Sequence, residues 1–164
     1  MGSPPARHIA GWLREIGIPV TFEALPADTF LPGLALERGQ LRVDEGRLEW
    51  PGDLLHEAGH VAVVPAEARP LLGGDLEVPG VDMTQLEWGA IAWSYAAALA
   101  IGIDPRDVFH DGGYRGRGPG LAQTFAVGGS IGVHVLEAAG MAAGPARAGA
   151  LGVDPYPHML RWLR

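Results

Sequence analysis

Two histidines stand four residues apart, with a glutamate directly after the first, in the run His56-Glu57-Ala58-Gly59-His60. On an α-helix, residues four positions apart share a face with Cβ atoms about 5–6 Å apart. Both imidazoles could therefore reach one cation at about 2.0–2.1 Å. Glu57 would lie beside that cation, where it could take a proton from a water molecule that the metal activates. The residue types and their spacing predict metal-assisted hydrolysis.

A catalytic zinc ion normally has three protein ligands and one water molecule. The chain has no cysteine, so the third ligand must come from a histidine or a carboxylate. Glu87 is the strongest candidate because it follows Leu86 in an apolar helical run without a basic neighbour on its face. A carboxylate there is costly to bury unless it is paired or binds a metal. His110 ranks second, and the other candidates are Asp75, Glu77, Asp82, Asp111 and His134.

Hydrolysis of a peptide also needs a donor that stabilises the tetrahedral oxyanion. His110 and Tyr114 lie in or next to the glycine-rich segment 111–120, which could fold over the site, and we predict that they are catalytic. Arg115 belongs to the same segment. Tyr95 lies about 12 Å along the helix from Glu87, which favours a place in the core or at the rim. Asp53, one turn before His56, is expected either to cap the helix or to orient an imidazole.

The remaining sequence predicts an α+β domain. A helix is expected after Pro4 and Pro5, ending at Gly17, and the glycine turn after Glu37 predicts a hairpin. Proline and glycine residues mark the start and the end of the helix that carries the motif. They are also frequent in the connection that follows this helix. The expected elements are helix 4–16, strand 20–25, a hairpin of 34–36 with 41–43, helix 53–64, helix 83–101 with Asp82 as a capping residue, and short helix 105–109. The sequence of segment 121–140 is compatible with two short helices and with a hairpin. Residues 157–164 are expected to form one or two helical turns.

These elements predict a short, mostly antiparallel sheet packed on the motif helix, with the next helix supplying the third ligand. No composition shift marks a domain boundary, so we expect residues 1–164 to form a single domain. Gly59 is unusual, because glycine inside a helix costs about 1 kcal/mol relative to alanine. It predicts close packing of the motif helix against a neighbouring element.

The composition of the chain argues against nucleic-acid and membrane partners. The net charge is −7 and all 12 basic residues are arginines, which argues against general nucleic-acid binding. The most apolar stretch, residues 91–103, is too short to span a bilayer, and the N-terminal residues lack a signal pattern. We therefore expect a cytoplasmic protein with no membrane partner. A homo-oligomer is left open.

The motif helix together with a glutamate on the next helix resembles the gluzincins. Within them, the chain is similar to small bacterial minigluzincins and to the peptidase-like domain of the ImmA/IrrE group. Residues 51–60 and 87–90 carry the likeness, which extends over about residues 34–103. The resemblance implies a zincin-like fold, Zn²⁺ held by His56, His60 and Glu87, Glu57 as general base, and a peptide or protein substrate.

Two other functions compete with a zinc peptidase. The same ligands could form a non-catalytic zinc-binding interaction or structural module, which would need a fourth protein ligand, with His110 or Asp111 the obvious suppliers. The histidines could also bind nothing. Manganese or another divalent ion remains an alternative to zinc, because histidine and carboxylate suit several metals.

Overall fold

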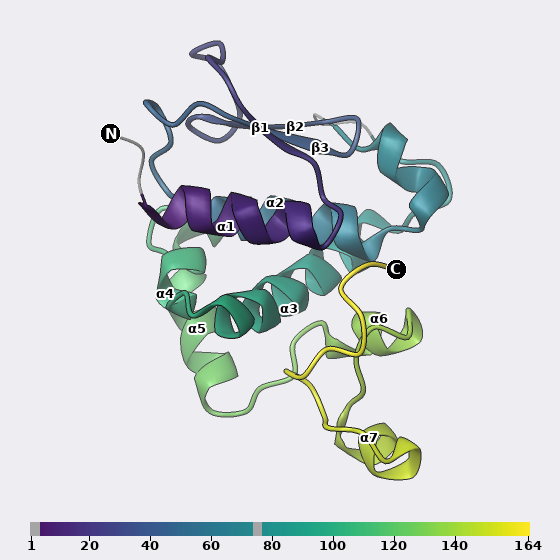
Figure 1. Cartoon of the computed structure of the whole chain (residues 1–164). Helices are drawn as coiled ribbons and strands as arrows, with labels where there is room; N and C mark the ends of the chain where they lie inside the picture. The colour runs from purple at the N-terminus through teal and green to yellow at the C-terminus, as the bar shows by residue number, and fades with distance from the viewer. Residues whose placement is uncertain (1–3, 74–76) are drawn as a thin grey trace.

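The computed structural model describes residues 4–73 and 77–164. Within them a small sheet lies over two helices, α1 and α2, and a long helix, α3, crosses beneath α2 (Figure 1). The mixed α+β class is confirmed. The elements up to the long helix are α1 (Pro4–Glu15), β1 (Val20–Phe22), β2 (Leu34–Glu37), β3 (Gln40–Val43), α2 (Asp53–Val63), the 3-10 helix η1 (Ala66–Leu71) and α3 (Met83–Ile101).

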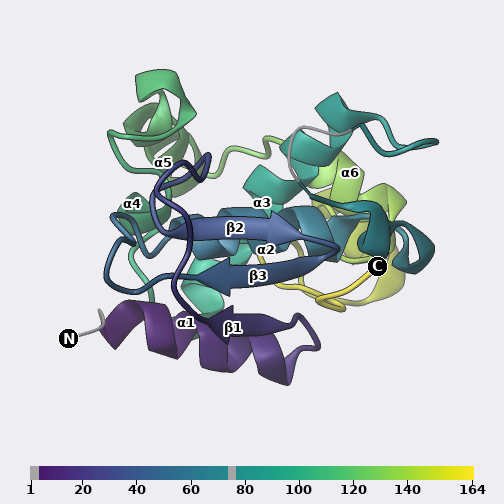
Figure 2. The ribbon, with the colours of Figure 1, turned by 90° about the horizontal axis from the view of Figure 1, so that it is seen from above.

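The sheet has the order β1-β3-β2 and covers α2 from above (Figure 2). Leu41 and Val43 alternate with polar residues along β3, and both are fully buried. The hairpin between β2 and β3 turns at Arg38 and Gly39, with φ of 52° and 74°. Two consecutive positive φ values are what a two-residue hairpin turn of type I′ requires. The predicted hairpin is therefore confirmed.

The prediction of a mostly antiparallel sheet is wrong for one of its two pairings. β2 and β3 are antiparallel, whereas β1 pairs with β3 in parallel. The strand predicted over residues 20–25 ends at Phe22. The chain then crosses in an irregular loop to the far edge of the sheet, where β2 begins at Leu34. Phe30 and Leu31 of this loop line the cavity that contains the predicted site residues.

α2 and α3 are the helices that carry the predicted ligands. α2 ends where Val64 turns to an extended conformation before Pro65. Asp82 caps α3 by accepting hydrogen bonds from the backbone N–H groups of Thr84 and Gln85, and Gly102 ends it with a φ of 73°. These boundaries agree with the sequence prediction, because capping and proline signals act locally.

Gly59 lies at a close contact between α2 and α3. A Cβ atom added to Gly59 would lie 2.9 Å from the carbonyl oxygen of Ala90 and 3.1 Å from its Cβ. The close packing that the sequence predicted is confirmed. It brings the backbone of the motif helix against the helix that bears Glu87.

We expect Gly59→Ala to destabilise the protein by about 1–3 kcal/mol, because the two helices must separate to admit the methyl group. This loss should exceed the gain of about 1 kcal/mol from the better helix propensity of alanine. Gly11→Ala is a matched control in α1, since an added Cβ there meets nothing within 4 Å. Urea unfolding should give shifts of opposite sign for the two variants. Equal stabilisation of both would contradict a rigid contact at Gly59.

The second half of the chain departs further from the prediction. Segment 111–120, expected as a loop, contains the 3-10 helix η2 (Tyr114–Gly116) and the start of α5 (Gly118–Ala126). Segment 121–140 forms helices, α5 and α6 (Val133–Ala138), rather than a hairpin. The predicted short helix is α4 (Pro105–Val108), and α7 spans Pro145–Leu151.

The helical turns predicted for residues 157–164 are wrong. This segment runs irregularly and makes one bridge, Ala142 with Met159. Trp162 packs its ring edge-on against Trp12 and Trp93, and its backbone carbonyl accepts a hydrogen bond from the Trp93 indole. Tertiary packing of the tryptophans therefore replaces local helical hydrogen bonds here.

Among the described residues, no helix combines the length and the apolar character needed to cross a bilayer.

Candidate metal centre

His56, Glu57 and His60 form a cluster that could hold a metal ion. One ligand atom from each residue lies within 4.8 Å of the ligand atoms of the others. All three side chains belong to α2, and the imidazole centroids are 4.7 Å apart. The helical spacing that suggested the motif therefore brings these side chains together as expected.

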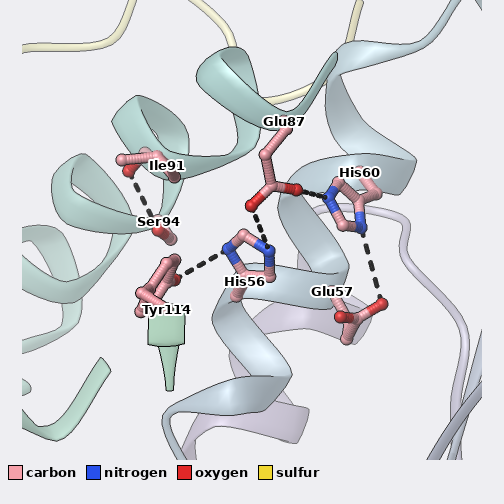
Figure 3. Close-up of polar contacts among 7 residues, drawn as sticks. All are labelled: His56, Glu57, His60, Glu87, Ile91, Ser94 and Tyr114. Carbon is pink, nitrogen blue, oxygen red and sulfur yellow. Dashed lines mark hydrogen bonds and ion pairs between the residues drawn. The ribbon is translucent and has the colours of Figure 1, made fainter. Parts of the chain in front are cut away.

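Glu87 reaches both imidazoles from α3. Its carboxylate oxygens lie 3.2 Å from Nε2 of His56 and 2.8 Å from Nε2 of His60. Figure 3 shows this carboxylate projecting from α3 between the two rings. The close approach of α2 and α3 at Gly59 makes this contact across the two helices geometrically possible.

The donor types of these residues suit a divalent cation. In a tetrahedral site with bonds of about 2.0–2.1 Å, neighbouring ligand atoms are about 3.3–3.4 Å apart. The distance of 3.2 Å between His56 Nε2 and Glu87 Oε1 is close to that value, and the 2.8 Å contact of His60 is a short hydrogen bond. Both histidines present the same nitrogen, Nε2, to Glu87. Two imidazoles and a carboxylate are also a donor set that catalytic zinc uses.

The charges around His60 favour a positively charged group between the carboxylates of Glu57 and Glu87. Burial would lower the pKa of His60, but hydrogen bonds with Glu57 and Glu87 raise it to about 9. Burial would raise the pKa values of Glu57 and Glu87, but their histidine neighbours hold both below the ordinary value. Both carboxylates are therefore anionic at neutral pH. Such a site attracts a cation.

Tyr114 contacts a predicted metal ligand directly. Its phenol oxygen lies 2.8 Å from Nδ1 of His56, the ring nitrogen that faces away from Glu87. Burial, reinforced by the charges of Glu87 and Asp53, raises the pKa of the phenol far above 10. Tyr114 therefore remains a hydroxyl group. Its polar atom is engaged with His56 in this structure.

His110 forms a buried pair with Asp53. Its Nε2 lies 2.7 Å from Oδ1 of Asp53, and its ring stacks on Trp50 at 4.1 Å with planes 5° apart. Burial raises the pKa of Asp53 despite this hydrogen bond. Gly52, not Asp53, occupies the capping position of α2, and no side-chain capping bond forms there. Asp53 thus orients an imidazole, but it is the imidazole of His110.

The predicted site residues line one cavity. This cavity has a volume of about 750 Å³ and is bounded by His56, Glu57, His60, Glu87, His110 and Tyr114, together with the loop residues Phe30 and Arg115. A second cavity of about 530 Å³ shares Phe30, Glu57 and His60 with the first. The candidate metal-binding residues therefore lie where the two cavities meet.

Other candidate ligands are placed elsewhere. Asp82 caps α3, and His134 contacts the side chain of Gln85. Asp75 lies outside the described residues. Tyr95 stacks on Phe125 against the core, as expected.

Sequence reasoning missed Trp50, Phe30 and Ser94 as neighbours of the site. Trp50 and Phe30 lie on segments whose course depends on tertiary packing, so no local pattern marked them. Ser94 is on the predicted helix, seven positions after Glu87 and thus on the same face. That spacing is the signal that could have identified it.

No protein-family model, curated protein or solved structure matches this chain in the comparisons made.

Proposed function

We propose that this chain is a zinc-dependent hydrolase that cleaves peptide bonds. The observation that carries the proposal is the carboxylate of Glu87 placed between the Nε2 atoms of His56 and His60. Glu87 reaches both imidazoles of α2 from the neighbouring helix, and the carboxylate of Glu57 has an oxygen within 4.8 Å of ligand nitrogens of both histidines, beside a cavity. This is the set of groups that metal-assisted hydrolysis requires.

His56, His60 and Glu87 would hold the ion, which supplies Lewis acidity that makes water nucleophilic near neutral pH. Glu57 is ionised, since its histidine neighbours keep its pKa low. It can therefore accept a proton from the water molecule that attacks the peptide carbonyl carbon. When the C–N bond breaks, the same side chain can deliver that proton to the leaving amine.

The shape of the site supports a peptide substrate with an apolar side chain on one side of the cleaved bond. The smaller cavity is walled by Leu34 and Leu36 of β2, with Leu31, Leu72, Met83 and Leu86 around it. The larger cavity carries polar groups, among them Asp53 and Arg115. A chain crossing the site would therefore meet apolar side chains on the β2 side, and both polar side chains and the apolar Leu31 and Trp50 on the other.

A second candidate function is a closed, non-catalytic metal site. It is favoured by the position of Glu57, because one oxygen of its carboxylate lies within 4.8 Å of a ligand nitrogen of each histidine. Glu57 would then be the fourth ligand, in place of the residues that the sequence suggested. His110 is less suited to that role because its Nε2 is paired with Asp53.

The proposal is tested by metal content and by chelation. Purified protein should carry about one zinc ion per chain and should cleave members of a mixture of unstructured peptides, read by mass spectrometry. A zinc chelator should abolish cleavage, and added Zn²⁺ should restore it. Protein that binds no divalent metal would overturn both candidates, whereas zinc without cleavage of any peptide would leave only the closed site.

A further inference from the structure

The segment that carries Tyr114 has an unusual backbone. Tyr114, Arg115 and Gly116 follow one another with φ values of 55°, 54° and 78°. Residues with a side chain adopt this left-handed region rarely and at a cost in free energy. Such a conformation persists only where the surroundings hold it, and it tends to occur at functional sites. The strained residues of this segment therefore call for a functional explanation.

The strained backbone holds the phenol of Tyr114 against the imidazole of His56. The phenol of Tyr114 meets Nδ1 of His56 at 2.8 Å, with its ring edge-on to the imidazole at 5.2 Å and 86°. Phe109 also packs against the ring, with centroids 5.4 Å apart. The buried Ser94 lies beside Tyr114 (Figure 3), and its hydroxyl donates to the carbonyl of Ile91 at 2.9 Å.

The hydrogen bond between Tyr114 and His56 can run in either direction. A neutral imidazole carries a proton on one nitrogen only. If Nε2 carries it, this nitrogen donates to Glu87 at 3.2 Å, and Nδ1 must accept from the phenol. If Nε2 gives its lone pair to a cation, Nδ1 carries the proton and donates to the phenol oxygen. The phenol hydrogen can then turn to Ser94, whose oxygen still has room to accept.

We propose that Tyr114 is a positioning residue that orients His56 and reverses its hydrogen bond when a cation binds. The inference rests on the proposed metal site but adds a role that differs from oxyanion stabilisation. A phenol suits the task because it both donates and accepts, whereas a carboxylate only accepts. The exchange balances, because the proton that Nε2 releases to solvent is matched by one that Nδ1 takes up from solvent. Tyr114 thus acts through His56.

The first test compares two tyrosines. Tyr114→Phe removes the hydroxyl that faces His56, and we expect zinc affinity to fall about 10–100-fold, as for other outer-shell partners of a metal ligand. Tyr156→Phe is the control: this phenol donates to the carbonyl of Ala92 at 2.7 Å and packs near Phe125, away from the ligands. Its loss should leave zinc affinity unchanged. Competition against a chromophoric chelator gives both affinities, and equal zinc affinity of Tyr114→Phe and the unsubstituted protein would overturn the proposal.

The second test needs no substitution in Tyr114. Long-range ¹H–¹⁵N spectra of histidine rings report which nitrogen carries the proton, and His56→Gln identifies the His56 signals. On addition of zinc, the His56 proton should move from Nε2 to Nδ1. A proton that stays on the same nitrogen would overturn the reversal even where zinc binds and peptides are cleaved. Failure of the unsubstituted protein to bind zinc would instead remove the proposed function together with this inference.

Discussion

Replacing Glu57 with glutamine is expected to leave zinc bound while it lowers the rate of peptide hydrolysis about 10²–10⁴-fold, the range typical of a lost general base. Glutamine has nearly the same size and shape, but it cannot accept a proton at neutral pH. The carboxylate of Glu57 is ionised in the folded protein because His60 and His56 lower its pKa. The substitution therefore removes the base without emptying the cluster.

Glu67→Gln supplies the matched control, because Glu67 is an exposed glutamate in η1, away from the ligands. Zinc per chain and the rate of peptide cleavage should be measured for both variants. Full turnover in Glu57→Gln would rule out its role as base. A large loss of zinc in the same variant would identify Glu57 as a fourth ligand and favour the closed, non-catalytic site.

Replacing His60 with alanine should reduce zinc from about one ion per chain to almost none. This imidazole contacts both carboxylates of the cluster, Glu87 at 2.8 Å and Glu57 at 3.5 Å. Its removal deletes a ligand, so the loss of affinity should exceed the 10–100-fold effect of an outer-shell partner. Zinc should accordingly raise the melting temperature of the unsubstituted protein but not of the variant, because ligands stabilise only the state that binds them.

The control for this loss is His134→Ala, an exposed histidine that contacts Gln85. Its zinc content should match that of the unsubstituted protein. Glu87→Gln tests the third ligand with little change in volume, and it should lower zinc affinity as His60→Ala does. Undiminished affinity in Glu87→Gln would exclude Glu87 from the coordination sphere, although its carboxylate lies between the two imidazoles.

Helical periodicity made the core of the site predictable. The positions of His56, Glu57 and His60 on one turn follow from the geometry of any α-helix. Glu87 could be inferred because a carboxylate in an apolar helical run needs a partner. Gly59 likewise indicated a close helix contact, since its lower helix propensity needs a compensating reason. Each of these inferences depends on neighbours within a few residues.

Strand pairing and the irregular segments were not predictable in the same way. The period of two along a strand gives the buried face, but it does not tell which strand lies alongside, so β1 was not expected to run parallel to β3. The loop from β1 to β2, which brings Phe30 to the cavity, depends on that pairing. In residues 157–164, contacts of Trp162 with Trp12 and Trp93 override local helical preference.

The sequence by itself determined the chemistry that this protein can offer: two imidazoles and a carboxylate on one helical turn, and a second carboxylate on the next helix. Only the tertiary structure decided which other side chains contact these groups. Tyr114 and His56 are 58 positions apart in the chain, and His110 and Asp53 are 57 positions apart. No local hydrogen-bond pattern or side-chain period relates residues so distant in the chain. They meet because the packing of α2, α3 and the α4–α5 segment fixes their positions.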